Sequence, residues 1–344
     1  MQNTLGGSKL EIYKEHFQRW LDGENPGPLV CEIGAVRGCN HACVHCGFQQ
    51  FQKYEDRPHF LHVAAGKRFL EDFKSLGGVE VFFAGNGEPL LHPDLPELIR
   101  HAAAQGLAVT LSTNGALLDA DVAEAILPSL KWLRVSLNGG NAAVYASVHR
   151  CPPGDFDRVR QNIAAAAAIR DRLGSPARIA MQFVAFRPNI ASIPDAARLH
   201  AAVGSDVLSI RDVFFRGRDQ REPDPDLVAA IRAVEGLPGV ENRCALVPAR
   251  RQAASWRFCR GIHFRTNLDD QGNLFTCNRH LVEDRVYGNI VEQSFRDIWA
   301  SSRRRRVFEE VAGDGPSPLC QEMCQVALDN RYIAAHAQAT GGAQ

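Results

Sequence analysis

The chain lacks three features that would point to particular classes of protein. Its 344 residues hold 39 basic and 39 acidic side chains, so net charge gives no case for nucleic acid or an anionic membrane as a partner. No stretch approaches the roughly 18 uninterrupted apolar residues of a membrane-spanning helix. The N-terminal sequence MQNTLGGSKLEIYKEHF has no apolar run of the signal-peptide type. We therefore expect a globular protein that stays in the cytoplasm.

Cysteine, by contrast, occurs ten times. The cytosol keeps thiols reduced, so clustered cysteines there bind metal or take part in chemistry more often than they form disulfides. Seven of the ten fall into two groups, one near each end of the chain. The first group is Cys39, Cys43 and Cys46, and the second is Cys259, Cys277, Cys320 and Cys324.

From about Leu29 to Phe215, short β-rich runs alternate with helical segments. The predicted strands are 29–36, 79–85, 107–113, 133–139, 177–186 and 206–215, and the predicted helices are 60–76, 94–105, 119–127, 155–173 and 190–203. Strands that alternate with helices form parallel, right-handed βαβ units, which can curl into a full or partial barrel. We predict an α/β fold, a partial (β/α)6 barrel with ligands at the C-terminal ends of its strands. Asp155 is the expected N-cap of its helix, and Gly174 lies just past the end.

The character of the chain changes after about Pro223. A predicted helix near 224–235 is followed by HFRTNLDDQGNLFTC (263–277), which predicts a hairpin because Asp-Gln-Gly separates two short strands. Another helix is expected near 294–311. The predicted organisation is an extension (1–28), a barrel core (29–223), a small C-terminal domain (224–335) and a tail (336–344).

The first cysteine group has the spacing C-x3-C-x2-C and directly follows the first predicted strand. Three thiolates on one short loop can bind three irons of a cubane cluster, and the fourth iron then has no protein ligand. An open coordination site on a metal is where a substrate or cofactor binds. The alternative is a zinc site with His41 or His45 as the fourth ligand, but the loop is short for tetrahedral closure. We expect the two histidines to be ordinary loop residues.

This loop and the segments after it resemble the radical S-adenosylmethionine (SAM) superfamily, whose signature is C-x3-C-x2-C after the first strand of a βα series. The following strand ends match in order. GNGEPLLHPDL (85–95) is similar to the family's Gly-Gly-Glu-Pro motif, and it is followed by STNG (112–115), SLNGG (136–140) and SVHRCPPGDFDRVRQNI (147–163). The resemblance covers roughly residues 29–215.

The resemblance implies a [4Fe-4S] cluster whose open iron chelates the amino and carboxylate groups of SAM. One electron from the cluster cleaves the C5′–S bond, and the 5′-deoxyadenosyl radical abstracts a hydrogen atom from the substrate. The cofactor carries this chemistry, while the protein supplies position and excludes water. A flavodoxin- or ferredoxin-type electron donor is implied as a partner.

The residues that the resemblance places around SAM are Phe48, Gly87, Glu88, Ser136, Asn138 and Arg150. Gly87 and Glu88 would contact the methionine amino group. Ser136 and Asn138 lie where ribose or carboxylate contacts come from, although many relatives have Asp at the second position. The arginine could bind a carboxylate bidentately, and the phenylalanine is a candidate neighbour of the adenine. The alternatives are a surface role for the arginine and a core role for the phenylalanine.

The second cysteine group resembles the C-terminal extension called SPASM, or its shortened form, twitch. Cys259 lies before the predicted hairpin, Cys277 closes it, and the C-x3-C pair follows the last predicted helix. Four thiolates can saturate one cluster, so the twitch form with one auxiliary [4Fe-4S] cluster fits, whereas a full SPASM domain needs more cysteines. Structural zinc is the alternative, because four cysteines also suit tetrahedral Zn²⁺.

Three cysteines and one basic run remain. Cys31 lies within the first predicted strand and is expected in the core. Cys151 or Cys244 could return a hydrogen atom to the substrate, as a thiol does in some radical epimerases of the superfamily, although a spare thiol is more often inert. The run Arg303–Arg306 predicts a solvated helix end, with a docking face for a flavodoxin-like donor as the alternative.

These features predict an enzyme but leave its substrate open. Only about 28 residues precede the first predicted strand, which is short for the leader-peptide-binding domain of many peptide-modifying relatives. We therefore expect a small polar metabolite of the carbohydrate, glycoside or nucleoside type, changed by oxidation, epimerisation or decarboxylation in natural-product biosynthesis. The rivals are a radical SAM peptide-modifying maturase and a non-catalytic zinc-binding module.

Overall fold

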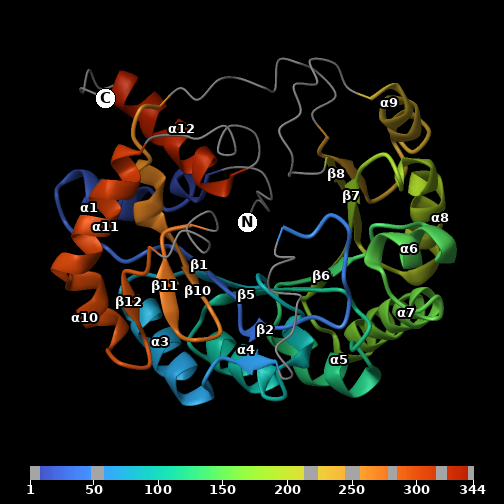
Figure 1. Cartoon of the computed structure of the whole chain (residues 1–344), viewed down its shortest axis with the longest axis horizontal. Helices are drawn as coiled ribbons and strands as arrows, with labels where there is room; N and C mark the ends of the chain where they lie inside the picture. The colour runs from blue at the N-terminus through green and yellow to red at the C-terminus, as the bar shows by residue number, and fades with distance from the viewer. Residues whose placement is uncertain are drawn as a thin grey trace.

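The computed structural model describes residues 8–47, 58–212, 224–244, 256–277, 285–314 and 324–339. Within these residues, ten strands form one sheet in the order β12-β11-β10-β1-β4-β5-β6-β7-β8-β9, and β2 pairs separately with β3. The sheet is curved and helices cover its outer face, while its inner face looks toward the middle of the molecule (Figure 1). The chain thus forms a partial barrel.

The elements have the following bounds. The strands are β1 (Val30–Ile33), β2 (Val36–Arg37), β3 (His59–Phe60), β4 (Glu80–Phe83), β5 (Ala108–Thr113), β6 (Trp132–Ser136), β7 (Arg178–Ala185), β8 (Val207–Asp212), β9 (Val240–Asn242), β10 (Arg265–Leu268), β11 (Asn273–Phe275) and β12 (Gly288–Asn289). The helices are α1 (Lys14–Leu21), α3 (Val63–Ser75), α4 (Leu95–Ala104), α5 (Ala120–Ile126), α6 (Ala142–His149), α7 (Asp155–Leu173), α8 (Ile193–Val203), α9 (Pro225–Arg232), α10 (Phe295–Ala300), α11 (Ser302–Gly313) and α12 (Gln325–Ala339). None of these helices is long and apolar enough to span a membrane.

The six strands predicted for the barrel are confirmed. They are β1 and β4 to β8, which are consecutive neighbours and parallel throughout. The sheet continues at both edges, because β9 pairs in parallel with β8 and β10 pairs in parallel with β1. The predicted hairpin is also present as β10 and β11, with Gly272 at φ +85° in its turn. The hairpin of the second cysteine group therefore extends the barrel's own sheet.

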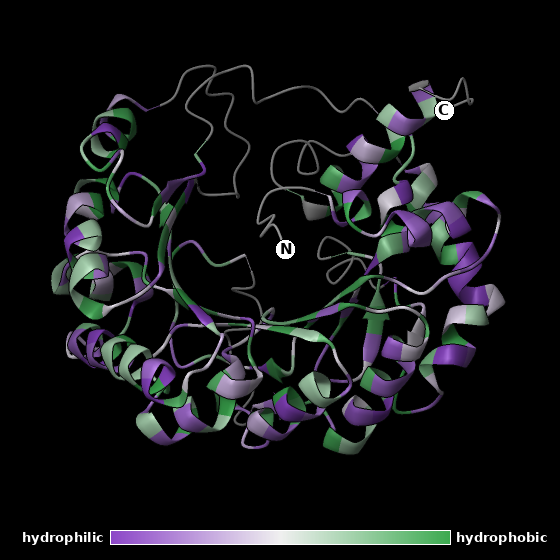
Figure 2. Cartoon of the chain, turned by 180° about the vertical axis from the view of Figure 1, so that it is seen from behind, coloured by the Kyte–Doolittle hydropathy of each residue, from purple (hydrophilic) through white to green (hydrophobic). Residues whose placement is uncertain are grey.

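The two faces of the sheet have different surroundings. Leu133 and Val135 of β6, with Leu208 and Ile210 of β8, belong to the main core that packs beneath the outer helices. Successive side chains of a strand point to opposite faces, so the intervening residues face inward. Figure 2 shows both hydrophobic and hydrophilic residues along the curved sheet. The apolar outer face holds the barrel together, and the inner face is left for polar groups.

Two predicted helix boundaries were wrong. The helix expected near 294–311 is divided into α10 and α11, because Ser301 is extended (φ −68°, ψ 152°) and its side chain caps α11. The N-cap of α7 is Gly154, and Asp155 is instead the first helical residue. The expected Gly174 does end that helix, in the left-handed conformation at φ +59°.

Helices α1, α6 and α12 were not predicted, and α12 continues to Ala339, into the segment predicted as a tail. Of the three, α6 is the one beside the first cysteine group. It begins after Asn141, whose side-chain oxygen accepts a hydrogen bond from the Val144 backbone N–H at 3.1 Å. This is the usual capping role of an asparagine, and it satisfies one of the free N–H groups of the first turn. The helix ends at His149, beside the first cysteine group.

The basic run is exposed at Arg303, Arg305 and Arg306, as predicted for a solvated helix end, but not at Arg304. Arg304 is 3% exposed, and its guanidinium stacks on the Trp299 ring at 3.6 Å. It also donates a hydrogen bond to the side chain of Asn25 at 2.8 Å. The middle of the run therefore fastens the C-terminal helices to the N-terminal extension.

Candidate functional site

The first three cysteines lie on the loop that follows β2, here named the cysteine loop (residues 38–47). Its backbone is fixed to the end of α6. The Ala42 N–H donates to the His149 carbonyl at 3.0 Å, and the Val44 N–H donates to the Val148 carbonyl at 2.9 Å. The last carbonyls of a helix have no hydrogen-bond donor inside the helix, so the backbone N–H groups of the loop serve as donors to the end of α6.

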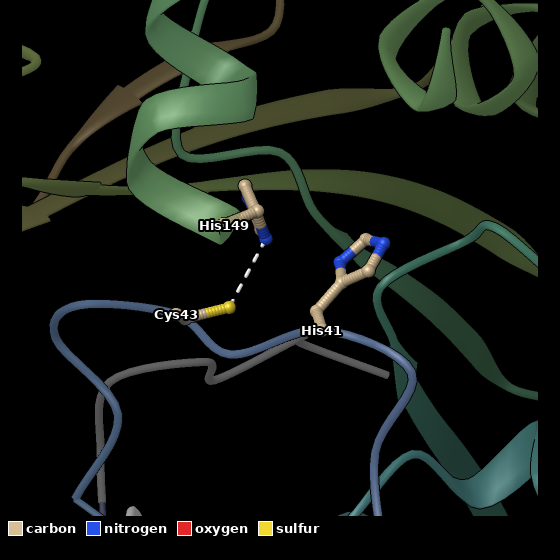
Figure 3. Close-up of side chains that lie close together, drawn as sticks. All are labelled: His41, Cys43 and His149. Atoms are coloured by element: carbon tan, nitrogen blue, oxygen red, sulfur yellow. Dashed lines mark hydrogen bonds between the residues drawn. The ribbon is translucent and has the colours of Figure 1, made fainter. Parts of the chain in front are cut away.

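His149 places its side chain directly behind the loop. The ring is fully buried and stacks on Tyr145 with centroids 4.2 Å apart. Its Nε2 lies 2.9 Å from the Leu137 carbonyl oxygen, which can only accept, so Nε2 carries the hydrogen. Nδ1 then faces the Cys43 Sγ at 3.2 Å (Figure 3). Burial, reinforced by the neighbouring His41, lowers the pKa of His149 to about 3, so the ring is neutral and Nδ1 accepts from the thiol.

His41 joins the loop to the first turn of α7. Its ring is 2% exposed, and Nε2 lies 3.1 Å from the Asp155 carboxylate. Burial lowers the pKa of His41, although the Asp155 carboxylate opposes that effect. The expectation of an ordinary loop residue was wrong for this histidine. The same contact explains why Asp155 does not cap its helix, since its carboxylate faces His41 and Arg158.

The motif Asn86-Gly87-Glu88-Pro89 packs against the start of the cysteine loop. A Cβ on Gly87 would lie 2.1 Å from the Gly38 carbonyl oxygen, so only glycine fits this close approach. The Glu88 N–H donates to the same oxygen at 2.6 Å. The glycine of this motif therefore allows two backbone segments to meet, and the meeting aligns the loop with the end of β4.

Glu88 is 2% exposed and organises the end of β5. Its carboxylate accepts hydrogen bonds from the Thr113 hydroxyl at 2.5 Å, the Asn114 N–H at 2.7 Å and the Leu90 N–H at 3.1 Å. Burial raises the pKa of Glu88, although the three donors oppose that effect. A carboxylate has about four acceptor positions, so one is left for the predicted contact with the SAM amino group.

The thiols are held beside these groups. Cys39 Sγ receives the His41 N–H at 3.4 Å and lies 3.8 Å from the Asn114 side-chain nitrogen. Burial, and then the Glu88 charge, raise the pKa of Cys39 to about 12. A thiolate at this position therefore requires the positive charge of bound iron, which deprotonates its cysteine ligands. Three thiols on one anchored loop fit a cluster with one open iron.

At the end of β6, Asn138 connects the cysteine loop to β7. Its Oδ1 accepts from the Val184 N–H at 2.8 Å, and its Nδ2 lies 3.2 Å from His45 Nε2. It has φ +46°, and Arg150 has φ +49°; these two are the positive-φ residues other than glycine in the described part of the chain. Arg150 is exposed just after α6, and Ser136 pairs with Gln182 of β7. The predicted SAM contacts of these residues remain predictions.

His45, which was expected to be an ordinary loop residue, is a largely buried part of the site. Its ring lies 5.4 Å from the Phe186 ring, and burial lowers its pKa to about 4. Its Nδ1 is buried without a hydrogen-bond partner among the described residues. Its position between Cys43 and Cys46 was the available signal. Phe48, the predicted neighbour of the adenine, lies outside the described residues.

The cysteines of the second group come from distant segments of the chain. Cys259 precedes the 3-10 helix Arg260–Phe264, Cys277 follows β11 and Cys324 precedes α12, and all three pack against the main core. The side-chain nitrogen of Asn330 donates to Cys259 Sγ at 3.3 Å. Cys320 lies outside the described residues. These thiols fit an auxiliary iron–sulfur cluster, since thiolates are its usual ligands.

The remaining cysteines lie apart from each other. Cys31 is fully buried in the main core, as predicted. Cys244 is 2% exposed and belongs to the same core, on the outer side of the sheet. Cys151 is near His41 and Asp155, with one ligating atom of each within 4.8 Å of the others. Burial raises the pKa of Cys151 to about 11. Their roles as hydrogen-atom donors remain predictions.

Comparison with known families places both cysteine groups in recognised domains. Residues 34–174 match the family described as the Radical SAM superfamily. Residues 259–325 match SPASM, described as an iron–sulfur cluster-binding domain. The two matches include the cysteine loop and the second cysteine group.

Individual relatives cover most of the chain. The AdoMet-dependent heme synthase of Methanosarcina barkeri is 34% identical over 342 residues, which span 90% of this chain and 93% of the relative. The PqqA peptide cyclase of Gluconobacter oxydans is 26% identical over 300 residues, 82% of this chain and 79% of the relative. Streptococcus suis SuiB bound to its precursor peptide SuiA has a similar fold, with a TM-score of 0.63 at 18% identity over 85% of this chain and 69% of SuiB.

Proposed function

This chain belongs to the radical SAM superfamily, and from that premise we propose that it is a radical SAM enzyme that modifies a peptide. Its radical SAM domain binds a [4Fe-4S] cluster and SAM, and its SPASM domain indicates auxiliary iron–sulfur chemistry. The observation that carries the proposal is the cysteine loop, whose three thiols are fixed by α6 and by the Gly87 motif.

We assign Cys39, Cys43 and Cys46 to the SAM-binding cluster. When bound, the cluster and SAM supply the 5′-deoxyadenosyl radical that abstracts a hydrogen atom from the substrate. Around that position, Glu88 holds the ends of β4 and β5 in register with the loop through its three hydrogen bonds. His149 supports the loop from behind through its backbone carbonyl, which accepts from the Ala42 N–H. These side chains set the geometry before the cofactors arrive, which lowers the reorganisation cost of the reaction.

The choice of a peptide follows the relatives. One relative, matched over 79% of its length, is named as a peptide cyclase, and SuiB, which shares the fold, is described in complex with a precursor peptide. These names favour the peptide-modifying alternative over the carbohydrate-type metabolite expected from the sequence. An electron donor of the flavodoxin or ferredoxin type is part of the proposal.

A tetrapyrrole is the second candidate substrate. The observation that favours it is the identity of 34% with a heme synthase over nine-tenths of both chains. A tetrapyrrole with carboxylate side chains and a peptide with a free C-terminus share one chemical feature, a carboxylate.

Anaerobic reconstitution tests the proposal. About eight irons per chain are expected from two four-iron clusters, and dithionite with SAM should yield 5′-deoxyadenosine. Absence of both iron and 5′-deoxyadenosine would refute the radical mechanism. Mass spectrometry of candidate peptides and of coproporphyrins after turnover then separates the substrates: loss of two hydrogens marks oxidation, loss of carbon dioxide marks decarboxylation, and an unchanged mass with altered chirality marks epimerisation.

A further inference from the structure

Three arginines lie close together on the inner face of the barrel. Arg134 is central in β6, between Leu133 and Val135, which face the outer core. Arg211 lies near the end of β8, and Arg243 directly follows β9. Because side chains alternate along a strand, Arg134 and Arg211 point away from the outer helices. All three arginines are partly exposed, so their guanidinium groups are neither sealed in the core nor out in bulk solvent.

Two of the three arginines form no ion pair with a described residue, although the charges of Glu80 and Glu32 act on Arg134 and that of Glu241 acts on Arg211. Arg243 forms an ion pair with Glu241 at 2.6 Å. Arg134 lies instead over the Phe82 ring, 5.2 Å from its centroid, and has neither an ion pair nor a hydrogen bond within the described part of the chain. The Nε of Arg211 is buried with no hydrogen-bond partner in those same ranges. A buried guanidinium N–H without an acceptor destabilises the folded protein, so a hydrogen-bond acceptor is missing at Arg211.

The arginines also repel one another. Burial, followed by the charges of Arg134 and Arg243, lowers the pKa of Arg211 to about 10. Burial also lowers the pKa of Arg134 and the Arg243 charge adds to that effect, whereas the Glu80 and Glu32 carboxylates oppose it. One carboxylate, Glu241, opposes the shift at Arg211. An added anion between Arg134 and Arg211 would offset the repulsion and fill the open donor positions.

This position is connected to the cysteine loop. Arg211 lies opposite Val184 in the pairing of β8 with β7, and adjacent strands are about 4.8 Å apart. The Val184 N–H is bound by Asn138, whose other end contacts His45 between two of the cysteines. Arg211 therefore lies one strand away from the residue that holds Asn138, at the end of the sheet that carries the cysteine loop.

We infer that Arg134 and Arg211 form a binding site for a carboxylate of the substrate. The inference rests on the proposed function for its reaction centre and adds the chemical group that is recognised. A guanidinium matches a carboxylate through two parallel N–H···O bonds, which orient the bound molecule as well as attract it. The aromatic ring of Phe82 holds the Arg134 head in place through a cation–π contact. The carboxylate belongs either to a peptide C-terminus or to a tetrapyrrole side chain, and both would be oriented toward the radical.

The test uses two pairs of probes with the reconstituted full-length protein and SAM. One pair is a short aromatic peptide as the free acid and as the C-terminal amide. The other is coproporphyrin III and its methyl ester. The wild type should bind at least one free acid about tenfold or more tightly than its neutral counterpart, and the preferred pair identifies the source of the carboxylate. Equal affinities in both pairs, or no binding below about 1 mM, would overturn the inference.

Variants locate the effect. Arg211→Gln and Arg134→Gln should each reduce the preference for the free acid over its neutral counterpart about tenfold. Arg211→Lys should retain part of this preference, because lysine keeps the positive charge but cannot form two parallel hydrogen bonds to the carboxylate. The matched control is Arg178→Gln, because Arg178 starts β7 and stacks on Trp132 at 4.6 Å, toward the opposite end of the strands. Iron content reports whether each variant folds and holds its clusters. Formation of 5′-deoxyadenosine in the absence of substrate reports SAM cleavage. Loss of preference in the control variant as well would contradict the assignment. Failure of SAM cleavage with the preference intact would refute the proposed function alone.

Discussion

The two cysteine groups of this protein are held in opposite ways. The first lies on one short loop, fixed through its backbone to the last carbonyls of α6. The described cysteines of the second lie at the start of a 3-10 helix, after the end of a hairpin and at the start of α12, and one of their sulfurs accepts a hydrogen bond from the side chain of Asn330. The ligands of the first group are positioned once a single loop takes up its conformation. The ligands of the second group are positioned only when the strands and helices that carry them have packed together.

The difference has an energetic consequence. Bringing distant segments together costs loop-closure entropy, which grows slowly with the length of the intervening chain. The second group meets that cost because β10 pairs with β1 and α12 packs against Arg260–Phe264. We expect the first group to depend mainly on its local contacts and the second on the C-terminal packing.

The largest expected effect separates the two groups by function. Cys43→Ala should abolish 5′-deoxyadenosine formation and remove about four irons, because the SAM-binding cluster loses a ligand. Cys259→Ala should also remove about four irons but leave SAM cleavage measurable. Iron analysis and chromatography of the reaction mixture check both variants. Equal loss of SAM cleavage in the two variants would show that the groups do not work independently.

Gly87→Ala should disturb the first group through its backbone. The added Cβ would lie 2.1 Å from the Gly38 carbonyl, so the motif must move away from the cysteine loop. Such overpacking costs about 1–3 kcal/mol, and iron should be lost from the first cluster first. Gly154→Ala is the matched control, since no atom lies within 4 Å of its added Cβ. Denaturant unfolding and iron retention are the measurements, and an unaffected Gly87→Ala protein would contradict the steric argument.

A pH effect is expected in the C-terminal packing. Burial, reinforced by Arg304 and Arg260, lowers the pKa of His263 to about 3. The unfolded chain takes up this proton below about pH 6.5, whereas the folded protein does not, so acid favours unfolding. The free energy of unfolding should fall by about 1.4 kcal/mol for each pH unit below that value on account of this residue. Urea titrations of the wild type and of His263→Gln at several pH values check it; identical slopes would count against the prediction.

The smallest expected effect concerns the cluster potentials. Asn330 is oriented by the Gly261 N–H, which donates to its Oδ1 at 2.6 Å, so its NH₂ group faces Cys259. Hydrogen bonds to cluster sulfurs raise the reduction potential. Loss of a bond worth about 1 kcal/mol corresponds to roughly 40 mV for one electron.

Asn330→Ala should therefore lower the potential of the auxiliary cluster by that amount in a spectroscopic redox titration. Asn114→Ala is the comparison in the first group, where the nitrogen lies 3.8 Å from Cys39 Sγ and a smaller shift is expected. A larger potential shift for Asn114→Ala than for Asn330→Ala would contradict this prediction.

Much of the barrel could be predicted from the sequence. Its strands are short apolar runs, its helices follow at regular intervals, and the cysteine loop directly follows the first of these strands and the short β2. Helix α6 was not predicted, although Asn141 before an alanine-containing run was an available capping signal. The buried position of Arg304 was also not predicted, because a run of four arginines resembles a solvated surface, and only the packing of Trp299 reveals otherwise.

What the sequence by itself determined was the local chemistry: the spacing of Cys39, Cys43 and Cys46, the glycine that allows close backbone approach, and the alternation that makes a parallel sheet. Tertiary structure decided which distant groups meet. His149 reaches Cys43, Asp155 reaches His41, and Asn330 reaches Cys259 across intervals of 106, 114 and 71 residues. Spacing along a chain fixes ligands that share one loop, but contacts over such intervals depend on how strands and helices pack, and no local pattern specifies them.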